Sequence, residues 1–189
     1  MRVFGIAGVA KAGKDTLALA LIKEAEKEGL LATKVSLAEP LKDDINPFLI
    51  EKLGIDIWNC SPEEKEFVRP LLVAYGRAQR EKTNGTYWTG LLSKRMKELK
   101  RDGYDLVIVP DIRYDEYPED EVFWIKENGD ALIHVSRLDE GGNKILPPNE
   151  DERLNDPKMI AAASNLIQWK TDEGGIKLIA KDLWISLNS

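Results

Sequence analysis

At 189 residues the chain suits a single α/β domain, residues 1–189, with room for a small inserted region, and it is too short for two full domains. Its net charge of −6 and pI near 5.0 argue against nucleic acid as a partner, while a single cysteine and a single histidine exclude an intrachain disulfide and a multi-histidine metal site. No apolar run approaches about 20 residues and no signal-peptide layout is present, so we expect no membrane segment and a cytoplasmic location.

The first element is a short apolar strand over Arg2–Ala7, which leads into a glycine-rich loop. Residues 8–14, Gly-Val-Ala-Lys-Ala-Gly-Lys, fit the first seven positions of the phosphate-binding pattern Gly-x-x-x-x-Gly-Lys-[Ser/Thr]. Such a loop turns its backbone N–H groups toward a polyphosphate, and the next helix adds its N-terminal dipole. Lys14 should reach the β- and γ-phosphates. The predicted phosphate-binding residues are Gly8, Ala10, Lys11, Ala12, Gly13, Lys14, Asp15 and Thr16.

Asp15 departs from the pattern, because a Ser or Thr hydroxyl usually meets a magnesium ion at that position. We expect Asp15 either to bind magnesium through water or to orient Lys14, and Thr16 to offer its hydroxyl to the phosphates. The alternative for the whole stretch is an ordinary glycine turn between a strand and a helix.

Apolar spacing, caps and chain breakers predict the first half of the remaining elements. They are a helix over Asp15–Glu28, a strand over Ala32–Ala38, a helical stretch from Glu39 that breaks at Asn46-Pro47 and ends before Gly54, and a helix from Pro62 that Pro70 kinks or restarts. The last of these begins with the capping box Ser61-Pro62-Glu63-Glu64. On a continuous helix Arg69, Arg77 and Arg80 would share one basic face, although a solvated surface is the alternative.

The second half contains a further candidate for chemistry. Leu106–Val109 is a continuous apolar run, typical of a central parallel strand, and it ends in Pro110-Asp111-Ile112-Arg113. Asp111 thus lies at the carboxyl end of the predicted strand. A carboxylate there suggests a second magnesium contact, or alternatively a helix cap or turn. The other predicted elements are a helix beginning at Tyr87-Trp88, a helix over Pro118–Asn128, a strand over Ala131–Val135 with His134 as a core residue, a pattern-free stretch Arg137–Asn155, a short helix from Asp156-Pro157, a strand over Leu166–Trp169 and a helix over Gly175–Leu187.

Five strands that alternate with helices predict an α/β fold, a doubly wound three-layer α/β/α sandwich on a five-stranded parallel sheet. A ligand should bind at the carboxyl ends of the strands. Trp88 is either a core residue under its helix, which we favour, or a wall for a stacked base.

Four motifs occur in order: Gly-x-x-x-x-Gly-Lys-Asp-Thr, Ala-Glu-Pro-Leu-Lys, Tyr-Trp and Asp-Ile-Arg. With them, most of the chain resembles the phage-type deoxynucleoside monophosphate kinases. The resemblance implies a P-loop, adenylate-kinase-like fold with ATP phosphates on the loop, a magnesium-associated carboxylate at Asp111, a monophosphate-binding helical region at about 39–88 and a lid at about 137–155. Trp169 stands where an Asn is common in that family.

The resemblance implies transfer of the γ-phosphoryl group of ATP to a deoxynucleoside monophosphate. Lys14, Arg113 and a lid arginine would be catalytic, with Arg137 preferred to Arg153. Asp15 and Asp111 would contact Mg²⁺ through water. The expected monophosphate-binding residues are Lys42, Arg69, Arg77, Arg80, Trp88, Asp111 and Arg113.

The alternatives are another P-loop kinase of a small molecule, of the dephospho-coenzyme A or phosphomevalonate kinase type, and a nucleotide-binding regulatory ATPase without an acceptor. For the leading interpretation, the expected partners are ATP and a deoxynucleoside monophosphate. A homodimer is left open, and a phage-encoded protein would act in the host-cell cytoplasm.

Overall fold

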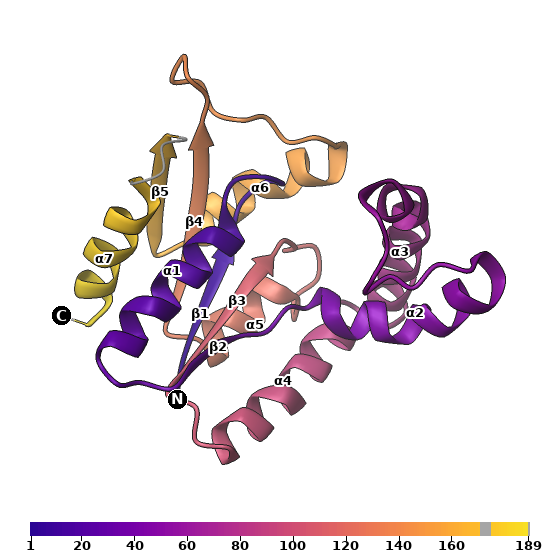
Figure 1. Cartoon of the computed structure of the whole chain (residues 1–189), viewed down its shortest axis with the longest axis horizontal. Helices are drawn as coiled ribbons and strands as arrows, with labels where there is room; N and C mark the ends of the chain where they lie inside the picture. Colours follow the sequence, from indigo (N-terminus) through magenta and orange to yellow (C-terminus); the bar gives the residue numbers. More distant parts are fainter. Residues whose placement is uncertain (171–174, 189) are drawn as a thin grey trace.

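The computed structural model describes residues 1–170 and 175–188. Within these residues a parallel sheet of five strands has the order β2-β3-β1-β4-β5 (Figure 1). The strands are β1 (Arg2–Ala7), β2 (Ala32–Lys34), β3 (Leu106–Ile112), β4 (Ala131–Leu138) and β5 (Asn165–Lys170). The helices are α1 (Lys14–Lys27), α2 (Ala38–Leu53), α3 (Pro62–Lys82), α4 (Thr86–Arg101), α5 (Glu121–Asn128), α6 (Glu150–Ala162) and α7 (Gly175–Asn188). None of the helices in these two ranges is long and apolar enough to span a membrane.

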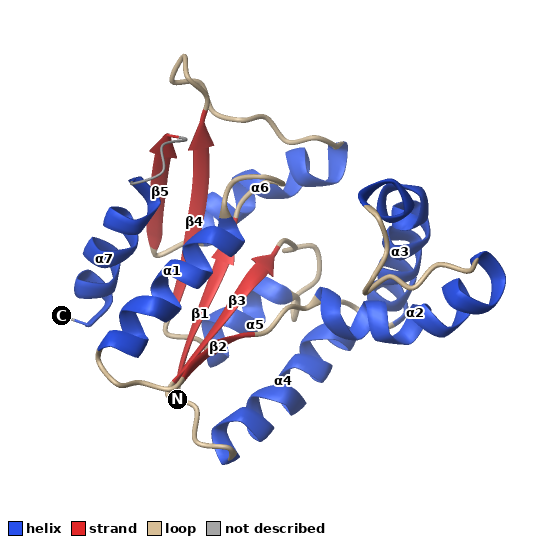
Figure 2. Cartoon of the chain, in the orientation of Figure 1, coloured by secondary structure: helices blue, strands red, loops and turns tan. Residues whose placement is uncertain are grey.

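Helices cover both faces of the sheet (Figure 2). In β3, Leu106 and Ile108 join the buried cluster under α1 and α7, whereas Val107 and Val109 join the cluster under α4, α5 and α6. Successive side chains of a strand point to opposite faces, so a strand buried on both faces has an uninterrupted apolar sequence. The predicted three-layer α/β/α sandwich is therefore confirmed.

Helices α2 and α3 stand to the side of the sheet; α2 follows β2 in the chain, and α3 is joined to β3 through α4 (Figure 1). They have a small core of their own, formed by Leu49, Ile55, Ile57 and Val68. Trp88 lies in the main core at the start of α4, and its indole N–H donates a hydrogen bond of 3.2 Å to the carbonyl of Gly76 in α3. This tryptophan is thus a buried anchor between α3 and α4, as the favoured interpretation held, and its ring is not open to a stacked base.

The predicted break at Asn46-Pro47 is wrong, because α2 continues through Pro47. The side chain of Asn46 does not cap a new helix. Its amide N–H donates to Oδ1 of Asp56 at 3.0 Å, and its oxygen accepts from the backbone N–H of Ile57 at 2.9 Å. Helix α3 also continues through Pro70, and its predicted capping box is confirmed by reciprocal bonds between Ser61 and Glu64.

The predicted strand Ala32–Ala38 is too long, because the chain leaves the sheet after Lys34 and α2 already begins at Ala38. The predicted start of α5 at Pro118 is also wrong. That helix begins at Glu121, after Asp120 at the N-cap.

The largest correction concerns the pattern-free stretch Arg137–Asn155. Strand β4 extends to Leu138, which places Arg137 inside the sheet, and α6 begins at Glu150 and contains Pro157. The helix starts early because the side chain of Asn149 accepts a hydrogen bond of 2.8 Å from the backbone N–H of Glu152 and because its first turn is acidic.

Candidate active site

The loop between β1 and α1 has the shape that the phosphate-binding pattern requires. Gly8 has φ +140° and Gly13 has φ +95°, both in the region that favours glycine. A Cβ at Gly8 would lie 2.3 Å from the carbonyl oxygen of Val135, and a Cβ at Gly13 would lie 2.4 Å from the ring of Trp169. The indole N–H of Trp169 also donates 2.8 Å to the carbonyl of Ala12. The loop is therefore held from outside by β4 and β5.

Lys14 lies within this loop and is 8% exposed. Its Nζ donates hydrogen bonds to the carbonyl oxygens of Gly8 at 2.7 Å and Val9 at 2.8 Å. Burial, followed by the nearby positive charge of Arg113, lowers the pKa of Lys14 to about 8. The ammonium group thus sits against two loop carbonyls and largely out of water, which suits an incoming polyanion.

A carboxylate from α6 reaches the loop. The backbone N–H of Ala10 donates a hydrogen bond of 2.6 Å to Oε2 of Glu152. The other oxygen of Glu152 lies 3.6 Å from Nη1 of Arg113, which comes from the end of β3. An anionic oxygen therefore already contacts both a loop amide and an arginine, which are the donor types that bind phosphate.

The two predicted magnesium carboxylates are engaged with the protein. Asp111 accepts hydrogen bonds from the hydroxyl of Ser36 and from the backbone N–H groups of Leu37 and Ala38, both at 3.0 Å. It thereby holds the first turn of α2, the cap role that the sequence left open. Asp15 pairs with Lys34 at 2.7 Å.

Among residues 1–170 and 175–188, no three His, Cys, Asp or Glu side chains are grouped to hold a metal ion. The carboxylates fit magnesium only as outer partners of an ion that phosphates hold. Thr16 is exposed at the start of α1.

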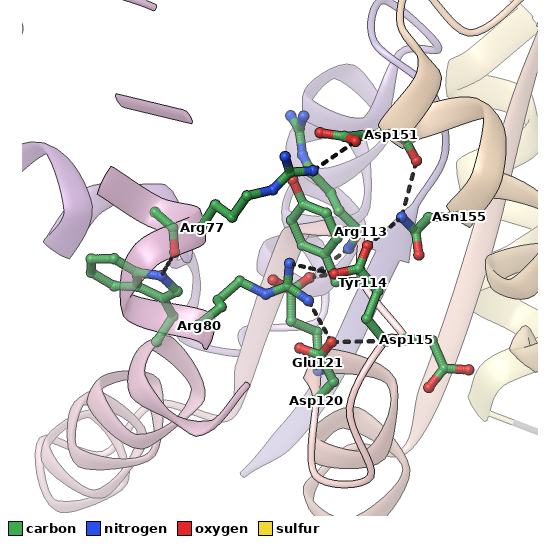
Figure 3. Close-up of polar contacts among 12 residues, drawn as sticks. Arg77, Arg80, Arg113, Tyr114, Asp115, Asp120, Glu121, Asp151 and Asn155 are labelled. Carbon is green, nitrogen blue, oxygen red and sulfur yellow. Dashed lines mark hydrogen bonds and ion pairs between the residues drawn. The ribbon is translucent and has the colours of Figure 1, made fainter. Parts of the chain in front are cut away.

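A cavity of about 700 Å³ lies between α3 and the start of α6, beside Arg113. Its α3 wall combines apolar and charged side chains, and α6 and the end of β3 form the opposite wall. Figure 3 shows Arg77 facing Asp151 across this space, with Nη2 of the arginine 2.9 Å from Oδ1 of the aspartate. The lining residues are Glu66, Arg69, Pro70, Val73, Ala74, Arg77, Ala78, Glu81, Arg113, Tyr114, Asn149, Asp151 and Glu152. A cavity of this size matches a small organic ligand.

The cavity adjoins the phosphate loop. Arg113 and Glu152 line both the cavity and a smaller recess that is bounded by Gly8 and Val9. Two of the predicted arginines, Arg69 and Arg77, therefore share one space with Arg113, next to the loop.

Arg80 does not belong to this face, and its predicted place beside Arg69 and Arg77 is wrong. Arg80 is 5% exposed, with its guanidinium 2.5 Å from Oδ2 of Asp120, 3.1 Å from Glu116 and 3.7 Å from the centroid of the Tyr114 ring. A fully buried carboxylate and an aromatic face draw it inward, so this arginine links α3 to the segment after β3.

Three other predicted residues lie elsewhere. Lys42 lies over the ring of Trp58, 4.7 Å from its centroid, and is not among the residues that line the cavity. Arg137 lies over the ring of Trp169 at 5.6 Å, behind the phosphate loop. Arg153 pairs with Glu150 on the exposed side of α6.

Three acidic residues of the site were not predicted from the sequence: Glu121, Asp151 and Glu152. Glu121 is buried in the first turn of α5 and accepts hydrogen bonds from the backbone N–H groups of Arg113 at 2.6 Å and Tyr114 at 3.1 Å. Burial, and then the charge of Asp120, raise the pKa of Glu121 to about 8. The signal for Asp151 and Glu152 was the acidic run after Asn149, which is typical of a helix start.

No protein-family model matches the chain, and no curated protein does. Solved structures do match. A dephospho-CoA kinase from Campylobacter jejuni gives a TM-score of 0.53 at 10% identity, over 99% of this chain and 98% of that one. A shikimate kinase from Acinetobacter baumannii in complex with shikimate gives 0.50 at 15% identity, over 100% and 94%. An APS kinase mutant from Mycobacterium tuberculosis gives 0.47 at 16% identity, over 100% and 97%.

Proposed function

We propose that this protein, which has the P-loop kinase fold, is an ATP-dependent kinase that transfers the γ-phosphoryl group of ATP to a deoxynucleoside monophosphate. The products would be ADP and a deoxynucleoside diphosphate. The observation that carries the proposal is the position of Arg113 between the phosphate loop and the cavity. This arginine lies 3.6 Å from the carboxylate that contacts the loop, and it also lines the cavity that contains Arg69 and Arg77.

Phosphoryl transfer depends mainly on in-line positioning and on neutralisation of charge. Lys14 and the loop amides would hold the β- and γ-phosphates of ATP. Arg113 would span the donor and acceptor phosphates, because it lines both the recess beside the loop and the cavity. An acceptor phosphate is already anionic, so no strong general base is needed.

The acceptor would bind in the cavity, with Arg69 and Arg77 on its phosphate and the apolar side chains of α3 along the nucleoside. Bound Mg²⁺ supplies charge neutralisation at the ATP phosphates, and Asp15 and Asp111 would hold its water ligands. Arg137 is proposed as the catalytic arginine beside the lid segment. Its backbone belongs to β4, and its side chain would have to leave the ring of Trp169 to reach the transferring group.

A second candidate is a kinase with a hydroxyl acceptor. The dephospho-CoA kinase and the shikimate kinase share the fold, and two carboxylates, Asp151 and Glu152, line the cavity beside the loop. A hydroxyl group, unlike a phosphate, gains from a base that takes its proton. This candidate therefore predicts a requirement for one of these carboxylates.

The test measures ATP consumption with eight nucleoside monophosphates, and with dephospho-CoA, phosphomevalonate and shikimate. We expect a deoxynucleoside monophosphate to be the best acceptor. Lys14→Ala is the control for the site, and it should keep the fold and lose at least ~10²-fold in turnover. If no monophosphate raises ATP consumption above the acceptor-free rate, the proposed function is wrong.

A further inference from the structure

Glu121 carries a buried carboxyl group that the proposed reaction does not use. It lies at the first residue of α5 and is 5% exposed. Its Oε2 accepts two hydrogen bonds from consecutive backbone N–H groups, those of Arg113 at 2.6 Å and Tyr114 at 3.1 Å. Figure 3 shows Glu121 beneath the segment that carries Arg113 and Tyr114.

These two N–H groups belong to the first residues after the paired part of β3. The last registered pair between β1 and β3 joins Ala7 to Ile112, so strand pairing ends one residue before Arg113. A backbone donor beyond a strand end needs another acceptor, and one carboxylate oxygen here fixes two successive peptide groups. These two N–H groups flank the Cα of Arg113, so the bonds to Glu121 hold the stretch of backbone from which its side chain leaves.

Glu121 is itself held by a buried ion pair. The side chain of the fully buried Asp120 accepts from the backbone N–H of Glu121 at 3.0 Å, from the backbone N–H of Glu116 at 3.0 Å and from Nη2 of Arg80 at 2.5 Å. The guanidinium of Arg80 also stacks on the ring of Tyr114. The turn at 113–114 is thus held on one side by the carboxyl group of Glu121 and on the other by Arg80 of α3.

We propose that Glu121 is a positioning residue: it fixes the backbone of Arg113 so that the guanidinium meets the donor and acceptor phosphates, with the Arg80–Asp120 pair supporting it. This inference rests on the proposed function, because it needs Arg113 to act on a substrate. The competing explanation is that Glu121 only stabilises the start of α5.

A double-mutant cycle separates the two explanations. Glu121→Leu keeps a similar volume and removes the acceptor, whereas Glu121→Gln keeps a carbonyl oxygen for the same N–H groups. We expect Glu121→Leu to lower kcat/KM for the acceptor by about 10- to 100-fold, since a displacement near 1 Å can cost that much. The KM for ATP should stay within about twofold, and Glu121→Gln should stay within about threefold of the parent in kcat/KM.

The decisive comparison is made with Arg113→Ala as the parent. There Glu121→Leu should cost less than about threefold, because the guanidinium that it positions is gone. An equal loss with and without Arg113 would overturn the inference, as would an equal loss in Glu121→Gln and Glu121→Leu. Asp130→Leu is the control for loss of a backbone acceptor outside the site. Asp130 accepts the backbone N–H of Val3 at 2.7 Å, so this variant should lose stability but keep kcat/KM.

A measurement without substrate keeps the test independent of the reaction. Amide hydrogen exchange, followed by NMR, should rise at least about tenfold at Arg113 and Tyr114 in Glu121→Leu and stay near the parent value in Glu121→Gln. Unchanged exchange in Glu121→Leu would overturn the inference whichever acceptor is used. If the exchange changes as expected but no monophosphate is turned over, the proposed function fails while the positioning of the backbone stands.

Discussion

Ala10 and Glu152 are 142 residues apart in sequence, yet the backbone N–H of the first donates a hydrogen bond of 2.6 Å to Oε2 of the second. Ala10 belongs to the phosphate loop, and the group that accepts its hydrogen bond is a carboxylate of the protein itself. A phosphate oxygen that binds this N–H must displace the carboxylate. The first turn of α6 therefore occupies part of the proposed ATP site.

Glu152→Gln should accordingly bind ATP more tightly, by about three- to tenfold, because the competing charge is removed and charge-assisted bonds are the stronger ones. Isothermal titration calorimetry measures the change. Glu150→Gln is the matched control: Glu150 lies in the same turn but pairs with Arg153, so its loss should leave ATP affinity unchanged. Weaker binding in Glu152→Gln would mean that the carboxylate assists the nucleotide.

Lys14 should give ATP binding a pH dependence above neutrality. Its pKa in the free protein is lowered to about 8, first by burial and then by Arg113. Phosphates would raise this pKa again in the complex, so binding takes up a proton once the free lysine is neutral. The affinity should then fall by up to about tenfold per pH unit above pH 8. Titrations at several pH values should show no such fall in Lys14→Arg, which stays charged.

Substitution of Arg77 should affect acceptor binding, whereas substitution of Arg80 should affect stability. The side chains of Arg77 and Asp151 are 56% and 37% exposed, so their ion pair adds little stability. Arg77→Ala should keep the thermal midpoint and raise the KM for the acceptor more than the KM for ATP. Arg80→Ala leaves the carboxylate of Asp120 buried without its cation, which should cost about 3–5 kcal/mol of unfolding free energy. Urea denaturation and steady-state kinetics distinguish the two, and equal stability losses would contradict the assignment.

Asp111 should matter for stability as well as for magnesium. Asp111→Asn weakens the bonds to the first turn of α2 and should cost about 1–2 kcal/mol. Ser36→Ala removes one donor to the same carboxylate and is the control, with a smaller loss. Turnover measured against Mg²⁺ concentration should shift to higher concentration in Asp111→Asn alone. An unshifted curve would leave Asp111 as a helix cap.

The sheet and the phosphate loop were predictable because their signals are local. The apolar strand, the glycines and Lys14 follow one another within residues 2–14. Gly8 and Gly13 both have a positive φ and neighbours that leave no room for a Cβ. The capping box at Ser61 and Glu64 is equally local and was also predicted correctly.

The site was less predictable because partners distant in sequence decide it. Helical spacing put Arg80 beside Arg77, but Asp120, 40 residues further on, draws it into the interior. Asn46 preceded a proline and so resembled a helix break, yet its side chain binds the turn at Asp56 and Ile57. The role of Glu152 at the loop depends on where α6 lies, which no periodicity in residues 137–155 indicates.

The phosphate loop takes its support from the last third of the chain. Gly8 rests against the carbonyl of Val135, and Gly13 lies under Trp169. Both supports are made long after residues 8–13 have left the ribosome. A nascent chain therefore has the whole glycine-rich loop, but it lacks the residues that pack against the loop until translation has passed Trp169. The site that is encoded first is completed last.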